Sequence, residues 1–134
     1  MQKGLLARKY YTEGANCSQA VALAFKDKLS LTEEQVKKYV IAFGGGFGRQ
    51  RLVCGAVSGM TFVLGALLSD GQDKLAIYKI EQQACAIVKE KLGSLVCAEL
   101  LEAKMGENAK KYSCAEICEI VASVTQDILT EYSK

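Results

Sequence analysis

Apolar residues recur every three or four positions along most of this chain, which is the spacing of an amphipathic α-helix. Residues 16–29 show the pattern clearly, behind Asn16 as a predicted N-cap. Residues 111–134 repeat it over the last part of the chain. No stretch alternates apolar and polar residues as a half-buried strand does. The pattern therefore predicts an all-α protein.

Capping residues and glycines divide this pattern into separate helices. Residues 30–43 open with Ser30 and Glu33, or with Thr32 and Gln35, in capping-box register, and stop at Gly44. We expect a single domain over residues 1–134, built as a bundle of about six helices with a glycine-rich loop before a central apolar helix. The expected helices are a short one around Leu5 and Leu6, then 16–29, 30–43, 55–68, 73–93 ending at Gly93, 94–106 capped by Ser94 and ended by Gly106, and 111–134.

The stretch AFGGGFGRQRLVCGAVSG, residues 42–59, holds six glycines, two arginines and a cysteine. It is not a phosphate-binding loop, because Arg49 and Gln50 stand where the P-loop needs lysine and serine or threonine. It is not a dinucleotide fingerprint either, since Arg49 replaces the third glycine and a predicted helix precedes it. Nucleotide binding through this loop is therefore not expected.

The uncharged run Leu52–Ser69 is nearly long enough to span a bilayer, and Gly55 with Gly59 forms a GxxxG pair. However, the run is rich in glycine, alanine, serine and threonine, and so is only moderately apolar. A central helix enclosed by others has the same composition, because small residues let its neighbours approach. We prefer that interpretation to a membrane helix.

The glycine loop also suits the activation of a thiol. Glycines can turn the chain tightly between two helices, which places Cys54 at or just before a helix N-terminus. The partial positive charge there favours a thiolate, and Arg49 and Arg51 are close enough in sequence to add to it. The alternative is that Cys54 is a small buried residue and that both arginines face solvent.

Composition narrows the function classes. The net charge of +2, without a basic stripe, gives no sign of nucleic-acid binding. The chain has no histidine, so imidazole catalysis and imidazole ligands are excluded. Its start does not have the pattern of a signal peptide, and six cysteines without an export signal point to a reducing cytoplasm. Tyr10, Tyr11 and Tyr112 are interpreted as packing residues at helix ends.

The cysteines and their surroundings follow a recognisable order. GANCSQAV surrounds Cys17, FGGGFGR precedes CGAVSG at Cys54, LGSLVCAELL surrounds Cys97, and a cysteine opens the last helix. Over nearly the whole chain this order resembles the C_GCAxxG_C_C family of redox-active proteins. The resemblance implies that the four signature cysteines are Cys17, Cys54, Cys97 and Cys114, with Cys118 as the alternative fourth. Cys85 is then extra, and its place in the apolar rhythm of Ile77, Ile80, Ala84 and Val88 predicts a core residue.

The first of three hypotheses is thiol–disulfide redox chemistry with an unidentified redox partner. Here Cys54 attacks, Cys17 resolves, and Cys97 with Cys114 forms a second pair, although the sequence leaves the pairing open. A disulfide between Cys114 and Cys118 is disfavoured, because residues four apart on a helix have Cβ atoms ~5–6 Å apart, against roughly 3.5–4.5 Å in a disulfide. Whether the chain is an enzyme stays open.

The second hypothesis is a metal ion or iron–sulfur cluster, with no such cofactor established by the sequence. The ligands would be Cys17, Cys54, Cys97 and Cys114 or Cys118, although the chain lacks zinc-ribbon knuckles and ferredoxin runs. The third is a non-enzymatic scaffold or partner-binding protein with buried cysteines. The small-residue helix could pack within one chain or against a second copy, so a homo-oligomer stays open.

Overall fold

The computed structural model describes residues 2–105 and 112–133. Among these residues no strand forms, and a single isolated β-bridge joins Val53 and Val96. The predicted all-α class is therefore confirmed. The elements are α1 (Lys3–Thr12), α2 (Cys17–Ala24), α3 (Glu33–Val40), the 3₁₀ turn η1 (Ile41–Phe43), α4 (Gly44–Phe47), α5 (Gly55–Leu68), α6 (Lys74–Leu92), α7 (Cys97–Met105) and α8 (Cys114–Tyr132).

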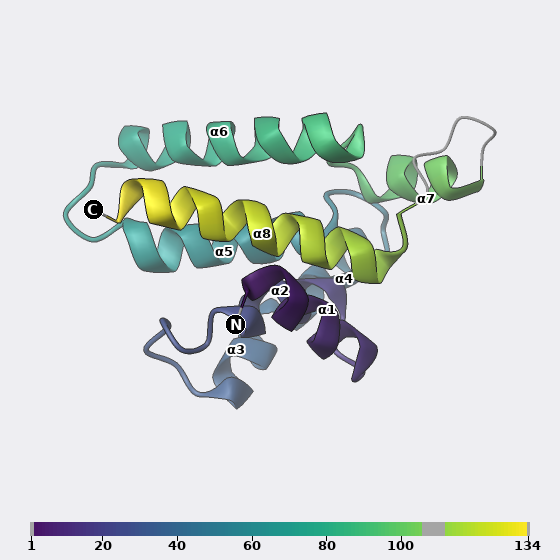
Figure 1. Ribbon diagram of the computed structural model, residues 1–134, viewed down its shortest axis with the longest axis horizontal. Coiled ribbons are helices and arrows are strands. Elements are labelled where there is room, and N and C mark those ends of the chain that lie inside the picture. The colour runs from purple at the N-terminus through teal and green to yellow at the C-terminus, as the bar shows by residue number, and fades with distance from the viewer. Residues whose placement is uncertain (1, 106–111, 134) are drawn as a thin grey trace.

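The helices form two groups (Figure 1). α5, α6 and α8 run along the long axis of the molecule, and α1, α2 and α3 are gathered on one side of them. α1 packs on α8, and α2 packs on α5. α5 contacts helices from both groups and buries most of its first ten residues, including Met60 and Leu64. The enclosed central helix expected from residues 55–68 is confirmed.

Small residues bring α2 and α5 close together. A Cβ atom added at Gly59 would lie 2.7 Å from the Ser18 carbonyl oxygen and 3.2 Å from the Val21 Cβ. A larger residue at this position would push the two helices apart, so the glycine serves helix packing.

No helix in the described part of the chain is both long and apolar enough to cross a membrane.

Local capping explains where several helices begin. Asn16, Thr32 and Ser113 each cap a helix as part of a capping box, and the Asp73 carboxylate accepts a hydrogen bond from the Ala76 N–H. Gly93 ends α6 in the left-handed conformation, with φ of 90°. Of the two capping boxes considered for residues 30–43, the one formed by Thr32 with Gln35 is present.

The expected helix over 94–106 begins later than predicted, so the Ser94 cap is wrong. The Ser94 hydroxyl instead accepts from the Val96 N–H and donates to the Glu99 carboxylate. The reason is tertiary, because the Cys97 N–H donates to the Leu52 carbonyl and ties this segment to a neighbouring loop. The predicted end at Gly106 lies outside the described residues.

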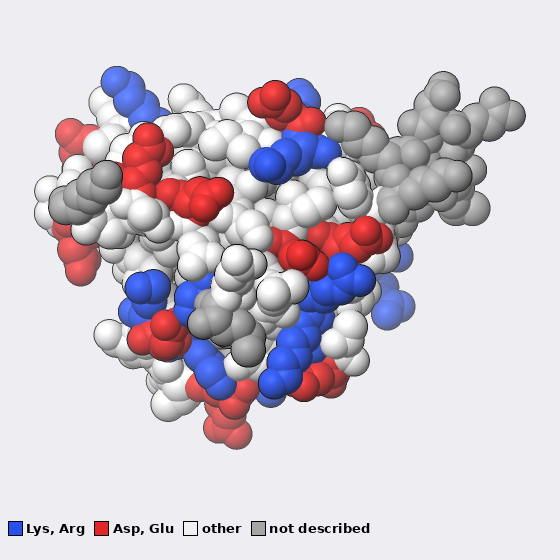
Figure 2. Space-filling view, viewed as in Figure 1, with Lys and Arg blue, Asp and Glu red and all other residues white. Residues whose placement is uncertain are grey.

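Charges of both signs lie side by side on the face shown in Figure 2, where Lys and Arg are interspersed with Asp and Glu. This mixture matches the small net charge of +2. The view shows no large area of a single sign, in keeping with the lack of a basic stripe in the sequence.

Candidate functional site: a pocket lined by four cysteines

The glycine-rich stretch, which includes α4 and the residues after it, turns back on itself before α5. Gly45, Gly46 and Gly48 adopt positive φ angles of 69°, 74° and 66°, which glycine reaches without steric cost. The Arg51 N–H donates to the Gly45 carbonyl and the Leu52 N–H donates to the Gly46 carbonyl, both at 3.1 Å. The tight turn expected from the sequence is therefore present.

Gly46 is needed for a second reason, which is the close approach of α7. A Cβ atom at Gly46 would lie 2.8 Å from the Cys97 Cβ and 2.6 Å from the Leu52 backbone nitrogen. Real Cβ atoms essentially never approach other heavy atoms so closely. The loop can pass over Cys97 only because this residue has no side chain.

A short pair of backbone hydrogen bonds holds Cys54 and Cys97 near each other. The Cys54 N–H donates to the Leu95 carbonyl at 2.8 Å, and the Cys97 N–H donates to the Leu52 carbonyl at 2.6 Å. These bonds flank the isolated bridge of the fold. Two cysteines that are far apart in sequence thereby become neighbours at the starts of α5 and α7.

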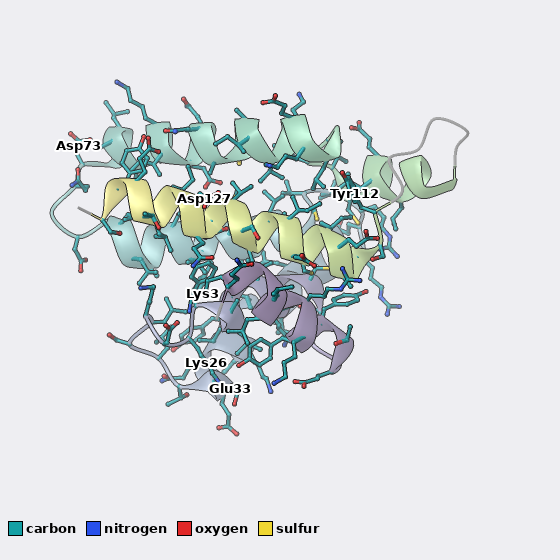
Figure 3. The ribbon with its side chains drawn as sticks, viewed as in Figure 1. Lys3, Lys26, Glu33, Asp73, Tyr112 and Asp127 are labelled. Atoms are coloured by element: carbon teal, nitrogen blue, oxygen red, sulfur yellow. The ribbon has the colours of Figure 1, made fainter. Side chains whose placement is uncertain are left out.

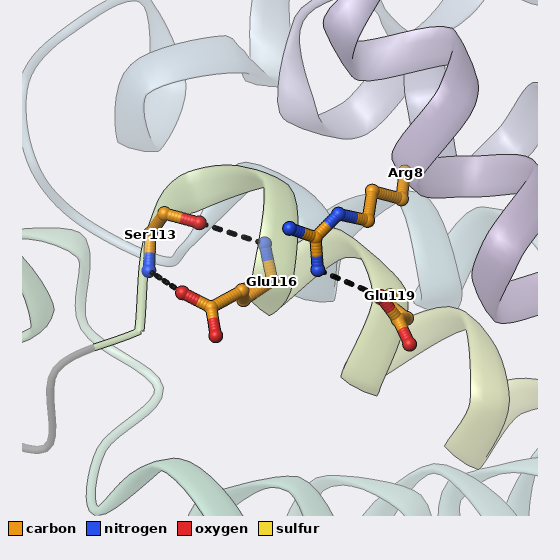
Figure 4. A network of polar contacts seen from close by, with 4 residues as sticks. All are labelled: Arg8, Ser113, Glu116 and Glu119. Atoms are coloured by element: carbon orange, nitrogen blue, oxygen red, sulfur yellow. Dashed lines mark hydrogen bonds and ion pairs between the residues drawn. The ribbon is translucent and has the colours of Figure 1, made fainter.

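Cys17 and Cys114 also stand at helix starts, directly after the capping residues Asn16 and Ser113. Gly55 lets Cys17 approach α5, since a Cβ atom there would lie 3.3 Å from the Cys17 Cβ. Figure 4 shows the capping box in which Ser113 and Glu116 bond each other's backbone N–H groups.

The position of α8 against α1 is supported by an ion pair that Figure 4 also shows. The Arg8 guanidinium lies 3.0 Å from the Glu119 carboxylate. The same two helices pack closely at Gly4, where an added Cβ would meet the Ser123 side chain and the Glu119 carbonyl. α1 and the first turns of α8 therefore form one packed unit behind Cys114.

All four predicted signature cysteines line one cavity of about 690 Å³. Cys54 is buried, and the other three are partly exposed. Cys85 and Cys118 are not part of the lining. The remaining described lining residues are Tyr11, Gly14, Ala15, Asn16, Ile41, Gly44, Gly45, Gly48, Arg49, Arg51, Gly55, Leu100, Leu101 and Ile117.

Cys17 lies at the centre of a group of hydrogen-bonded sulfurs. Its side chain is hydrogen-bonded to Cys114 and to Cys118, and the Cys118 thiol also faces the Cys17 carbonyl at 3.9 Å. The bond with Cys114 lowers the pKa of Cys17. The bond with Cys118, burial and the neighbouring sulfur charges act in the opposite direction and outweigh it, so the net pKa lies well above the ordinary thiol value.

Tyr11 joins the same group, which the sequence did not reveal. Burial raises the pKa of its hydroxyl, and the charges of Cys114 and Cys17 and a hydrogen bond with Cys114 raise it further. Tyr11 was interpreted as a packing residue because nothing in the sequence around it indicates that Cys114 lies nearby. Only the packing of α1 on α8 brings the two together.

Cys54 is the N-cap of α5, as expected, but burial outweighs the effect of the helix start on the pKa of its thiol. Only 5% of Cys54 is exposed, and this burial raises the pKa of its thiol. The backbone N–H groups of Val57 and Ala56 lower the pKa, as a helix N-terminus should, but they do not compensate for burial. The Arg51 guanidinium donates to a different sulfur, that of Cys97, at 3.7 Å.

Cys85 lies elsewhere, on α6, and packs against the hydrophobic core. Its thiol donates to the Glu81 carboxylate at 3.5 Å. Burial, together with the charge and hydrogen bond of Glu81, raises the pKa of Cys85 to about 12. Its surroundings are those of an inert core thiol, as the apolar rhythm of this helix suggested.

The cysteines do not converge as metal ligands do. Within the described residues, no group of three or more Cys, Asp or Glu side chains is arranged to hold a metal ion. The lining instead brings the sulfurs together in contacts between neighbours, such as Cys17 with Cys114.

Comparison with known proteins identifies a family for this chain. The model of the family described as "Putative redox-active protein (C_GCAxxG_C_C)" matches residues 15–128. Comparisons with curated proteins and with solved structures find no match. The matched residues include all four pocket cysteines and most of the chain, so this chain belongs to the C_GCAxxG_C_C family.

Proposed function

We propose that this member of the C_GCAxxG_C_C family uses its pocket for thiol–disulfide exchange. The observation that carries the proposal is that Cys17, Cys54, Cys97 and Cys114 line one cavity. Exchange requires an attacking sulfur, a second sulfur within reach and access for the partner. A cavity lined by several sulfurs, three of them partly exposed, meets these requirements.

Cys97 is the sulfur best placed to react first. It is partly exposed, and the Arg51 guanidinium lies beside it. Because the attacking form is a thiolate, a neighbouring positive charge favours attack. This assignment replaces the sequence-based choice of Cys54, whose burial raises its pKa.

The partner is a disulfide that Cys97 attacks, forming a mixed disulfide and releasing one partner thiolate, which takes up a proton. Cys54 is held beside Cys97 by the backbone pairing and resolves this intermediate. The partner leaves as two thiols, having gained two electrons and two protons, and the pocket keeps one disulfide. Exchange among the pocket sulfurs then moves that disulfide to Cys17 and Cys114 without a further change in electron count. These two are the proposed storage pair because they are hydrogen-bonded as thiols.

A reducing cytoplasm would return the pocket to its thiol state after each reaction. The first experiment is an oxidant titration of the reduced protein, followed by alkylation, intact mass measurement and peptide mapping. We expect the loss of two hydrogens, with the new disulfide mapped to Cys17 and Cys114. Cys114→Ser should abolish that product, and Cys85→Ser, the matched control, should leave it unchanged.

Two outcomes would contradict the proposal. Oxidation that depends equally on Cys85 would show that the pocket confers no special reactivity. Native protein carrying the extra mass of a metal or cluster, with the pocket thiols resisting oxidation, would favour the metal hypothesis instead.

A further inference from the structure

The charged side chains that line the pocket, among the residues that the structure describes, are all positive. Among its described lining residues the ionised side chains are those of Arg49 and Arg51, and no Asp, Glu or Lys contributes. Both arginines are exposed, so they lie where the cavity meets solvent. A ligand that enters the pocket from solvent therefore meets two exposed guanidinium groups among the residues around the sulfurs.

Within the described part of the chain, no acidic side chain pairs with these two arginines. Neither Arg49 nor Arg51 forms an ion pair with any side chain that the structure describes, whereas Lys3 pairs with Asp27 and Lys26 with Glu33 (Figure 3). Unpaired charge of one sign along a cleft with low-dielectric walls concentrates the field and attracts ions of the opposite sign. The pocket is thus arranged to attract anions.

The loop holds both arginines in a backbone conformation that they would not choose. Their φ angles are 67° and 63°, in the left-handed region, where a residue other than glycine costs roughly 1–2 kcal/mol. Hydrogen bonds from the Arg49 N–H to the Gly44 carbonyl and from the Arg51 N–H to the Gly45 carbonyl maintain it. Glycine would be less strained at either position. The loop therefore tolerates this strain in order to place two arginine side chains at the pocket.

The dimensions of the site suit a small molecule. A volume of about 690 Å³ lies within the ~300–1,000 Å³ of ordinary ligand pockets. Ile41 and Leu100 add apolar walls beside the polar entrance. Cys97, the proposed first sulfur, is only partly exposed, so a small disulfide can reach it more readily than the surface of a folded protein.

We infer that the disulfide reduced in this pocket is a low-molecular-weight disulfide bearing carboxylates, which Arg49 and Arg51 bind while Cys97 attacks. This inference rests on the proposed function. The Cys97 thiolate attacks one sulfur of the molecule, RSSR, and one RS⁻ leaves and takes up a proton. A second pocket thiolate then displaces the other RS⁻, which is protonated in turn. RSSR becomes two RSH, and two pocket thiols become one disulfide.

The test uses three disulfides of similar size and different charge with the reduced full chain. These are 3,3′-dithiodipropionate, which is anionic, bis(2-hydroxyethyl) disulfide, which is neutral, and cystamine, which is cationic. Each rate of thiol loss is divided by the rate of the same disulfide with free dithiothreitol, which removes differences in intrinsic reactivity. We expect the anionic probe to exceed the neutral one by about tenfold at low salt, the neutral one to exceed the cationic one, and the differences to shrink as salt is added.

Arg49 is the residue to change, because Arg51 contacts the reacting sulfur directly. Arg49→Gln should reduce the preference for the anionic probe over the neutral one several-fold, while Arg49→Lys should restore most of the preference. Arg49→Gly should lose the preference without losing thermal stability, since glycine relieves the positive φ. Arg8→Gln, which removes the same charge from the surface of α1, is the matched control and should keep the preference.

The outcomes separate this inference from the function on which it rests. Equal normalised rates for the three probes, with a disulfide still formed at Cys17 and Cys114, would overturn the inference and leave thiol–disulfide exchange intact. A preference that Arg8→Gln lowers as much as Arg49→Gln would overturn it as well, because net charge alone would explain the result. If neither these probes nor a strong oxidant forms a pocket disulfide, the proposed function itself fails.

Discussion

Cys97 and Cys85 are both partly exposed cysteines on helices, and their charged neighbours are opposite. At the pocket, the Arg51 guanidinium donates to the Cys97 sulfur at 3.7 Å. On α6, the Cys85 thiol itself donates to the Glu81 carboxylate at 3.5 Å. A cation beside a sulfur favours the thiolate, whereas a carboxylate favours the thiol. Similar exposure therefore does not imply similar surroundings, and the sign of the neighbouring charge separates the two cysteines.

The two regions also differ in backbone. Around the pocket the chain needs glycines with positive φ, and three residues other than glycine, Phe47, Arg49 and Arg51, share that conformation. Around Cys85 the backbone is a regular 19-residue helix. Strained conformations persist only where the surroundings hold them, and they are found most often at functional sites. Among the described residues, the residues other than glycine that have positive φ all lie in the loop beside the pocket.

The largest effect should come from Gly46→Ala. The new Cβ would meet the Leu52 nitrogen at 2.6 Å and the Cys97 Cβ at 2.8 Å, in a residue with φ of 74°. We expect the free energy of unfolding to fall by about 3 kcal/mol, measured by urea denaturation under reducing conditions.

Gly65→Ala is the matched control, because nothing lies within 4 Å of a Cβ atom added at this helical position. It should raise the free energy of unfolding by roughly 0.5–1 kcal/mol, through the better helix propensity of alanine. If Gly46→Ala proved as stable as the wild type, the close passage of the loop over Cys97 would be wrong.

A smaller effect is expected from removing the Glu81 carboxylate, which helps to keep the Cys85 thiol protonated. Burial is the first cause of its raised pKa of about 12, and Glu81 adds to it. Glu81→Gln should lower that pKa, and alkylation of Cys85 between pH 8 and 10 should become about tenfold faster for each unit by which the pKa falls. Peptide mapping after iodoacetamide treatment measures this rate, and Cys97 in the same sample is the internal control. An unchanged Cys85 rate would mean that burial alone suppresses its ionisation.

Glu81→Gln should also change how the stability of the protein depends on pH. An unfolded Cys85 loses its proton near the ordinary value of 9.0, whereas the folded residue keeps it up to about 12. The contribution of Cys85 is therefore fully present below pH 9 and is lost as pH rises from 9 towards 12. Glu81→Gln should make this decline shallower, which denaturation at a series of alkaline pH values would show.

The smallest change in stability is expected at two helix caps, which lie at opposite ends of the molecule and can be compared. Ser113 caps α8 beside Cys114, and Asp73 caps α6 far from it, as the positions of Tyr112 and Asp73 in Figure 3 show. Ser113→Ala and Asp73→Ala should each lower the free energy of unfolding by about 1 kcal/mol. Only Ser113→Ala should also shift the dithiol–disulfide equilibrium of the pocket, measured in redox buffers of graded potential. Equal shifts in both variants would mean that the equilibrium follows overall stability rather than the position of Cys114.

Helix periods, capping residues and glycines were sufficient to predict most of the fold. Asn16, Thr32 and Asp73 mark helix starts through contacts within one turn, so local sequence contains the information. The prediction that Ser94 caps a helix was wrong. The start of α7 depends on a backbone hydrogen bond from Cys97 to Leu52, and no local sequence pattern indicates that bond. The helix over 55–68 was predicted to its ends, since its apolar run is bounded by Cys54 and Ser69.

For the candidate site, too, some features could be predicted from the sequence and others could not. The order of the motifs was enough to choose Cys17, Cys54, Cys97 and Cys114, all of which line the pocket. The sequence also showed that a glycine-rich turn must precede Cys54, because so many glycines have no other use between two helices. These conclusions depend on residue type and on short spacings, which are properties of the chain before it folds.

Tertiary structure alone decided which sulfurs become neighbours and which charge each one meets. The packing of α1 and α2 on α8 brings Tyr11 and Cys17 to Cys114, and the bridge between two distant segments sets Cys54 beside Cys97. Burial then raises the pKa of Cys54 against the effect of its helix N-terminus. A pKa depends on every atom within several ångströms, and most of those atoms belong to residues far away in sequence.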